Sequence, residues 1–388
     1  MKSFEYFAPT LIDFGCGKVT KVGQHTAAYG KRALLVTVPE FPAVKELYAK
    51  VIESLTQAGL AVAHFDGVIP NPTTDVVTKG AQMARAFQAD VVVGLGGGSS
   101  MDTAKAIAVE ATHPGTSWDY LHYTKGPTEK TLPIIAVGTT AGTGSQTTPC
   151  AVITKTENKD KSAIWHKNIF PKVAIADPEI TATMPANITA QTGFDAFCHN
   201  FEAYLSVNTN PLVETMALDA IRRIAKFLPK AVRDGGDMEA RAQMCWADTL
   251  GGLTNASAGV TLPHGLGMQI GGHCPHVTHG QALAILYPEF MRYTYESAIP
   301  KFAAVGRIFN PALQQESDDA AAQKSCGAMD AFLKEIGLWI GFEDVQVSME
   351  DLRKIADCGQ VLGDYKNNPR VATIDEMYSL LKKCYSRA

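Results

Sequence analysis

The sequence predicts an α/β plus all-α protein, with a mostly parallel sheet wrapped by helices in its first half and a helical second half. In the first half, short apolar runs rich in β-branched residues alternate with stretches of helical periodicity, as expected for a parallel sheet. Beyond about Pro185 such runs thin out, and apolar residues recur at helical spacing. A chain of 388 residues is long enough for two domains. We therefore place the domains at residues 1–185 and 186–388.

Five runs in the first half are expected to form buried strands, because they are short, apolar and bounded by turn-forming residues. They are residues 32–38, 60–65, 89–95, 132–137 and 172–176. Helices are expected over residues 74–88 and from about Val44 onward. Pro39 and Pro42 interrupt the chain before the latter helix, so its start is placed only near Val44.

The second half shows clear helix signals. Asn210 is a favoured N-cap residue, and Pro211 follows at the first helical position. Acidic residues come early in this segment and lysines late, as the helix dipole prefers. Residues 318–335 and 349–358 are also expected to be helical. We assign the helix that begins at Pro211 to packing alone.

Composition excludes several classes of protein. Apolar residues make up 46% of the chain and charged residues 19%, as in ordinary soluble globular proteins. The net charge of −4 gives no electrostatic footprint for nucleic acid or an anionic membrane. There is no uninterrupted apolar run of about 18 residues and no apolar leader, so neither a membrane span nor a signal peptide is expected. The eight cysteines lack C-x-x-C spacing and indicate reduced thiols in a cytoplasmic protein.

Two glycine-rich loops follow strong predicted strands. Gly97, Gly98 and Ser99 come after residues 89–95, at the start of a predicted helix. Glycines let backbone N–H groups approach a phosphate, and the helix N-terminus adds positive potential. The loop matches neither the Rossmann nor the Walker pattern. A second small-residue loop, residues 138–145, follows the next strand. Loops at the carboxyl ends of parallel strands line one crevice, so we expect a nucleotide phosphate there.

A second cluster contains metal-binding side chains. Asp195 and His199 are four residues apart, which places both on one face of a helix. Four of the ten histidines fall within the sixteen residues from His264 to His279, the others being His273 and His276. A carboxylate and several imidazoles can share one divalent cation. Cys274 lies among them, and we expect it to pack rather than bind metal.

These motifs resemble those of the iron-containing, or group III, alcohol dehydrogenases over nearly the whole chain. The resemblance implies an N-terminal nucleotide-binding α/β domain and a C-terminal helical metal-binding domain. It implies metal ligation by Asp195, His199, His264 and His279. It also implies pyrophosphate binding at Gly97, Gly98 and Ser99, and it places five residues beside the cofactor: Asn71, Asp102, Thr139, Thr140 and Thr143.

Two residues and one spacing depart from the family pattern. Val38 stands where members often carry an aspartate that disfavours NADP, so either NAD or NADP is expected as cofactor. Met268 replaces a histidine near the nicotinamide, so another proton donor is needed. His273, five residues further on, is the nearest unassigned imidazole, and we take it as the candidate catalytic residue. The spacing from His264 to His279 is one residue longer than the pattern, which leaves His276 as the alternative fourth ligand.

The expected activity is reversible hydride transfer between NAD(P) and a primary alcohol or short aldehyde. Three nitrogen ligands and one oxygen ligand suit Fe²⁺ and Zn²⁺ about equally, and the resemblance favours Fe²⁺. Two alternatives stay open: a metal-dependent cyclase or lyase resembling dehydroquinate synthase, and a non-enzymatic module that binds nucleotide and metal. We also expect the protein to form a homo-oligomer, specifically a dimer. A small-molecule alcohol or aldehyde is its only other expected partner.

Overall fold

The computed structural model describes residues 3–387 and contains two compact units. One unit is Phe7–Met184, and the other comprises residues 185–387 together with residues 3–6. The division lies one residue from the boundary placed at 185/186. The binding roles assigned to the two domains remain predictions.

The unit Phe7–Met184 is built on a six-stranded sheet in the order β1-β8-β5-β4-β2-β3, in which every pair of neighbours is parallel. Its strands are β1 (Leu11–Phe14), β2 (Arg32–Val36), β3 (Ala61–Phe65), β4 (Val91–Gly96), β5 (Ile134–Gly138) and β8 (Val173–Ala176). The predicted parallel sheet and its five predicted strands are confirmed. The edge strand β1 was not predicted, and neither was an antiparallel hairpin of β6 (Cys150–Lys155) and β7 (Asp160–Trp165).

The helices of this unit are α1 (Val22–Ala27), α2 (Pro42–Gln57), α3 (Thr74–Phe87), α4 (Gly98–Glu110) and α5 (Pro178–Thr181). Helix α2 begins at Pro42, two residues before the loosely predicted start near Val44. Proline fits the first helical turn because its fixed φ is helical and its missing N–H has no partner there anyway. Pro42 therefore starts this helix rather than delaying it.

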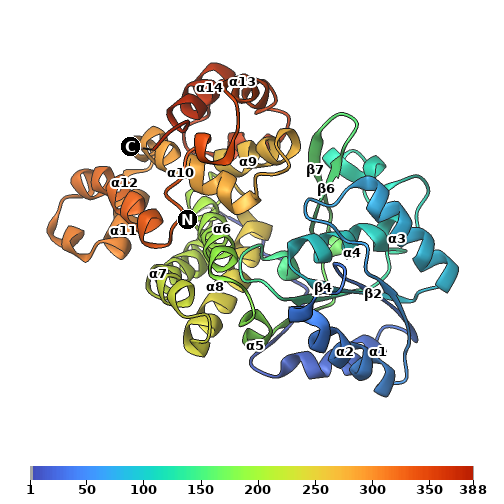
Figure 1. Cartoon of the computed structure of the whole chain (residues 1–388). Helices are drawn as coiled ribbons and strands as arrows, with labels where there is room; N and C mark the ends of the chain where they lie inside the picture. Colours follow the sequence, from blue (N-terminus) through green and yellow to red (C-terminus); the bar gives the residue numbers. More distant parts are fainter. Residues whose placement is uncertain (1–2, 388) are drawn as a thin grey trace. The chain divides into compact units, whose positions relative to one another are not determined.

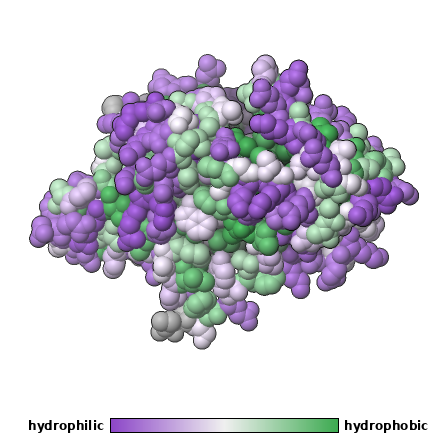
Figure 2. All heavy atoms as spheres, turned by 90° about the horizontal axis from the view of Figure 1, so that it is seen from below, coloured by the Kyte–Doolittle hydropathy of each residue, from purple (hydrophilic) through white to green (hydrophobic). Residues whose placement is uncertain are grey.

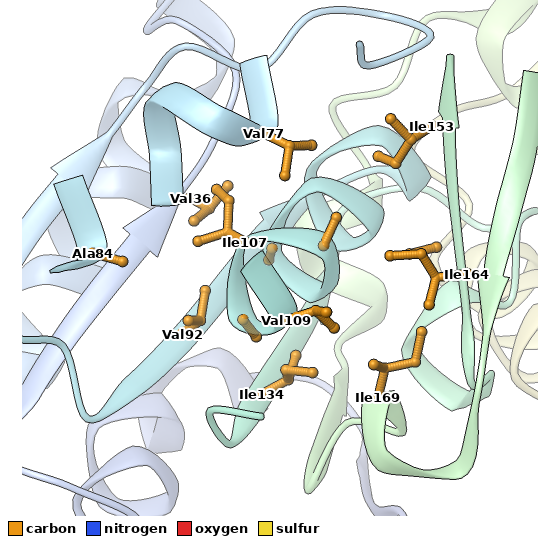
Figure 3. Packing of buried hydrophobic residues seen from close by; sticks show 14 of the residues in the cluster. Val36, Val77, Ala84, Val92, Ile107, Val109, Ile134, Ile153, Ile164 and Ile169 are labelled. Carbon is orange, nitrogen blue, oxygen red and sulfur yellow. The ribbon is translucent and has the colours of Figure 1, made fainter. Parts of the chain in front are cut away.

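Apolar side chains pack on both faces of the sheet, because successive residues of a strand point to opposite faces. Leu34 and Val36 join the cluster of Figure 3, whereas Ala33 and Leu35 join the cluster on the other face. Helix α4 runs through the first cluster and is buried along most of its length, since α3 packs beside it and β6 covers it. The start of α4, where the glycine loop lies, is therefore held on several sides.

The second unit is helical, as predicted. It contains the helices labelled in Figure 1 as α6 (Ala186–Leu205), α7 (Pro211–Arg233), α8 (Met238–Ala258), α9 (Leu262–His273), α10 (His279–Thr294), α11 (Ile299–Phe309), α12 (Asp318–Glu335), α13 (Met349–Asp357) and α14 (Ile374–Lys383). The Asn210 side chain accepts hydrogen bonds from the backbone of Leu212 and Val213, both at 3.1 Å, so the predicted N-cap of α7 is confirmed. Across residues 3–387, no helix is long and apolar enough to cross a membrane.

Helix α6 is the centre of this unit and packs against α7, α8 and α10. One of its faces is aromatic: Phe194 and Phe197 contact Tyr287 of α10 edge-on, with ring centroids 5.2 and 5.7 Å apart. Most of the large apolar side chains are buried, and the face in Figure 2 shows hydrophilic side chains over much of its surface, with smaller hydrophobic areas between them. The other face of α6 is also buried, but it carries polar side chains.

Candidate metal centre

Three helices bring the predicted metal ligands together within the helical unit. Asp195 and His199 lie one turn apart on α6, and both are buried. His264 lies in the first turn of α9, and His279 is the first residue of α10. A capping box between Thr278 and Gln281 fixes the start of α10, and the Thr278 hydroxyl also donates to Gln191 of α6. The start of α10 is thereby tied to the helix that carries Asp195.

The three imidazoles converge on one carboxylate oxygen. Asp195 Oδ1 lies 3.6 Å from His199 Nδ1, 3.5 Å from His264 Nε2 and 3.7 Å from His279 Nε2. Candidate ligand atoms of Asp195, His199 and His264 all lie within 4.8 Å of one another. His279 joins these three residues through Asp195, since its Nε2 lies 3.7 Å from Asp195 Oδ1.

The donor set fits a divalent cation. Asp195 Oδ1 and His264 Nε2 are buried, and neither has a hydrogen-bond partner among residues 3–387. Buried polar atoms nearly always have a partner, and two such atoms facing each other at 3.5 Å can both be satisfied by one shared cation. Three imidazole nitrogens and one carboxylate oxygen are the ligands that Fe²⁺ and Zn²⁺ accept. The residues present therefore fit the ion that the sequence predicts.

The neighbouring charges shift the pKa values of Asp195 and His264 strongly. Burial alone would raise the pKa of Asp195, but the imidazoles of His199, His264 and His279 lower it to about 2. Burial alone would lower the pKa of His264, but Glu202 and Asp195 raise it to about 10. Both shifts show that this buried group of side chains favours positive charge between the two carboxylates, as a bound cation would supply.

The structure separates His279 from the alternative ligand His276. His276 is exposed, and its Nε2 donates to the backbone oxygen of Val345 at 3.0 Å. His279 Nε2, in contrast, lies 3.7 Å from the carboxylate of Asp195. Cys274 is buried in the turn between α9 and α10, which is compatible with the expected packing role. The geometry thus favours His279 over His276.

His273 is not brought close to this group. It is the last residue of α9, and its Nδ1 donates to the backbone oxygen of Gln269 at 3.1 Å. Nine residues separate it from His264, which in an α-helix is the opposite face and about 13 Å along the axis. Met268 lies on the same face of α9 as His264, one turn on, and is largely buried.

In the unit Phe7–Met184, the two small-residue loops lie against each other. Their strands β4 and β5 are neighbours, and the Thr139 N–H donates to the Gly96 oxygen at 2.9 Å. A Cβ on Gly98 would lie only 2.7 Å from the methyl group of Thr143, so this contact requires glycine. Ser99 lies in the first turn of α4, where no side chain caps the backbone. These loops therefore present backbone N–H groups at a helix N-terminus.

Thr140 and Asp102 play different parts in these loops. The Thr140 hydroxyl lies next to Gly97 and has no hydrogen-bond partner among residues 3–387, which suits an acceptor such as phosphate. The Asp102 carboxylate instead accepts from the Ser145 hydroxyl at 2.6 Å and the Val152 N–H at 3.0 Å. Asp102 thus anchors the second loop to α4, whereas its contact with the cofactor remains a prediction.

Asn71 and Val38 lie on other loops of the same unit. Asn71 has a positive φ of 51°, and its side-chain oxygen accepts from Lys161 Nζ at 2.8 Å. Val38 is half-buried two residues beyond β2, and its backbone oxygen accepts from the Tyr48 hydroxyl at 3.2 Å. Its side chain packs against the apolar cluster of Figure 3.

Sequence reasoning missed two polar residues at these sites. Lys161 lies in β7, within a hairpin that was not predicted, and carries no motif. Glu202 is seven residues beyond Asp195 and three beyond His199, so helical periodicity alone could have placed it on the same face of α6. It is fully buried and accepts a 2.7 Å hydrogen bond from His264 Nδ1.

Comparison with known proteins identifies the family. Residues 9–178 match the description "Iron-containing alcohol dehydrogenase", and residues 189–385 match the C-terminal part of the same family. The chain is 35% identical to 1,3-propanediol dehydrogenase of Klebsiella pneumoniae over 99% of both chains. It is 32% identical to NAD-dependent methanol dehydrogenase of Bacillus methanolicus, over 97% of this chain and 98% of that protein.

A solved structure agrees with these matches. An archaeal halo-thermophilic alcohol dehydrogenase from a Red Sea brine pool superposes with a TM-score of 0.95 at 35% identity, covering 99% of this chain and all of that one. The predicted resemblance and the predicted alcohol–aldehyde oxidoreductase activity are confirmed, and the two alternative functions receive no support. The chain belongs to the iron-containing alcohol dehydrogenase family.

Proposed function

We propose that this enzyme interconverts a primary alcohol and a short aldehyde, using NAD(H) or NADP(H) and a divalent cation held by Asp195, His199, His264 and His279. The observation that carries the proposal is the convergence of three imidazole nitrogens within 3.7 Å of one buried carboxylate oxygen. The cation, Fe²⁺ in preference to Zn²⁺, would supply Lewis-acid polarisation of the carbonyl oxygen. Asp195 contributes the only negative charge among the four proposed ligands.

The protein's own groups bind and orient the reactants. Backbone N–H groups of Gly98 and Ser99, at the N-terminus of α4, suit the negatively charged pyrophosphate of the cofactor. The unpartnered Thr140 hydroxyl can donate to the same phosphate. His199, His264 and His279 are fixed by three different helices, so their nitrogens keep their directions when a ligand enters.

Relatives support the choice of cofactor and substrate. The Bacillus methanolicus relative is named as NAD-dependent and acts on methanol, and the Klebsiella relative acts on 1,3-propanediol. We therefore propose short primary alcohols as the substrate class. The test is an anaerobic panel of short, straight-chain aldehydes with NADH or NADPH and added Fe²⁺. Oxidation of the nicotinamide with several of them is expected, and none with any of them would contradict the proposed substrate class.

Val38→Asp is expected to raise the preference for NADH over NADPH at least several-fold. We propose that residue 38 lies beside the adenosine ribose, where a carboxylate would repel a 2′-phosphate and accept a ribose hydroxyl. The ratio of kcat/KM for the two cofactors measures this preference. Val38→Asn is the matched control, because it has the same shape without the charge. An unchanged ratio in Val38→Asp would mean that the residue does not face the ribose.

His273→Gln tests the proposed proton relay. Because Nδ1 of His273 donates to Gln269, its Nε2 is left to exchange protons. The distance along α9 requires water or a ribose hydroxyl between His273 and the nascent alkoxide. If His273 is the relay, its loss lowers turnover with intact metal content and flattens the pH–rate profile near neutrality. Unaltered turnover across that range would remove His273 from the mechanism.

We propose further that the protein is a cytoplasmic homodimer. All eight cysteines are free thiols, which supports a reducing compartment. Strand β1 is an edge strand that exposes Leu11, and such edges commonly pair with a second chain. Light scattering coupled to size exclusion should give twice the mass of the chain, and the mass of one chain would contradict the dimer.

A further inference from the structure

Among residues 3–387, no lysine or arginine forms a hydrogen bond or ion pair with the buried carboxylate of Glu202. It lies on the polar face of α6, one turn beyond His199, and its side chain is completely buried. Within residues 3–387 its only charged or ionisable hydrogen-bond partners are His264 and Tyr287. An isolated buried carboxylate is very costly, so such a residue needs a full set of donors.

Four hydrogen bonds supply these donors. Glu202 Oε2 accepts from the Thr261 N–H at 2.7 Å and from the Thr261 hydroxyl at 3.2 Å. Glu202 Oε1 accepts from His264 Nδ1 at 2.7 Å and from the Tyr287 hydroxyl at 3.2 Å. The Thr261 N–H can only donate, and a carboxylate can only accept. The carboxylate is therefore held in one orientation by three residues, Thr261 and His264 at the start of α9 and Tyr287 of α10.

This orientation determines how His264 presents its two nitrogens. Because Nδ1 carries the hydrogen donated to Glu202, a neutral His264 has its lone pair on Nε2. Nε2 is the buried nitrogen without a hydrogen-bond partner, and it faces Asp195 Oδ1 at 3.5 Å. His264 is thus oriented for a cation before any cation is bound.

The charges of the buried carboxylates also suit a divalent cation. Asp195 and Glu202 are the two buried carboxylates that face His264, at 3.5 Å from its Nε2 and 2.7 Å from its Nδ1. Asp364 is a third carboxylate that interacts electrostatically with His264 and Glu202, and burial raises its pKa to about 6. Two negative charges with neutral imidazoles balance a divalent cation, and Asp195 alone would leave a buried net charge. Outer-shell carboxylates of this kind orient a histidine ligand and increase its basicity.

We propose that Glu202 is a positioning residue of the metal centre, which fixes His264 with Nε2 toward the cation and provides the second balancing charge. This inference rests on the proposed assignment of the four metal ligands. Glu202 itself does not touch the cation in this proposal. It acts through His264.

Tyr287→Phe is the matched control. It removes one of the four hydrogen bonds to Glu202 but leaves the Glu202–His264 bond. The phenylalanine ring keeps the edge-on contacts with Phe194 and Phe290, both at 5.2 Å. Its effect therefore measures the cost of disturbing this buried network without removing the carboxylate.

The experiment titrates metal-free wild type, Glu202→Gln, Tyr287→Phe and His199→Ala with Co²⁺, following the visible absorption of the bound ion. Loss of an outer-shell partner typically costs about 10- to 100-fold in metal affinity. We expect the dissociation constant of Glu202→Gln to rise within that range, with an altered spectrum, and that of Tyr287→Phe to stay near the wild-type value. Equal affinities for Glu202→Gln and Tyr287→Phe would overturn the inference.

The His199→Ala variant distinguishes a wrong assignment of the metal ligands from a wrong role for Glu202. If it loses Co²⁺ while Glu202→Gln does not, the metal centre stands and Glu202 has no part in it. If His199→Ala also binds normally, the ligand assignment fails and the inference fails with it. If Glu202→Gln does not fold, the imidazole N–H signals in the NMR spectrum of Zn²⁺-loaded wild type test the inference instead. An exchange-protected Nδ1–H of His264 supports the inference, and its absence overturns it.

Discussion

Replacing His199 with alanine is expected to remove the bound metal and, with it, turnover. His199 supplies one of the three imidazole nitrogens around Asp195 Oδ1 and comes from α6, which is buried along most of its length. Changes to outer-shell partners already cost roughly 10- to 100-fold in metal affinity, so loss of a direct ligand should cost more. Elemental analysis of purified protein and NADH-dependent aldehyde reduction measure the two effects.

His276→Ala is the control for this variant. It removes a histidine from the same cluster in the sequence, but an exposed one that bonds to Val345. Metal content and turnover should match the wild type. Circular dichroism should show the same helical content in both variants. Full metal occupancy in His199→Ala, or its loss in His276→Ala, would show that the ligands are wrongly assigned.

Gly98→Ala is expected to weaken NADH binding about tenfold or more while leaving metal affinity unchanged. The added Cβ would lie 2.7 Å from the methyl group of Thr143, closer than such atoms normally approach. Overpacking of this kind costs about 1–3 kcal/mol. The loops must move apart to relieve it, and each 1.4 kcal/mol lost from binding is about a tenfold change in dissociation constant. Fluorescence titration with NADH measures the effect.

A second substitution tests whether the contact with the Thr143 methyl group causes the loss of NADH affinity. Thr143→Ser removes the methyl group that meets the new Cβ but keeps the hydroxyl predicted to lie beside the cofactor. The double variant Gly98→Ala/Thr143→Ser should therefore recover part of the lost affinity. Wild-type NADH affinity in the correctly folded single variant would show that this loop does not bind the pyrophosphate.

The fold could be predicted largely because its strong elements are locally encoded. The apolar run that became β4 and the cap and proline that start α7 each carry their own signal. Strand β1 was missed because its residues are mostly only partly buried and show no alternation. The β6–β7 hairpin was missed because residues 156–159 contain no Asn-Gly or Asp-Gly turn, with Lys159 taking the positive φ instead.

The metal site could be predicted only in part from the sequence. The pairing of Asp195 with His199 follows from helix geometry alone, since both lie on α6. The choice between His276 and His279 depends on the turn that follows α9, which leaves His276 exposed and places His279 at the start of α10. Glu202 shares the periodicity of Asp195, but only the position of His264 in space shows what it binds.

The most direct test follows deuterium from C4-deuterated NADH into an aldehyde, using metal-free protein reconstituted with Fe²⁺ under anaerobic conditions. We predict one alcohol carrying deuterium at its carbinol carbon for each NADH oxidised, with activity that reaches its maximum at one Fe²⁺ per chain. His199→Ala should show neither. Equal transfer by the metal-free protein, or no oxidation of NADH by protein that has bound both metal and nicotinamide, would contradict the account.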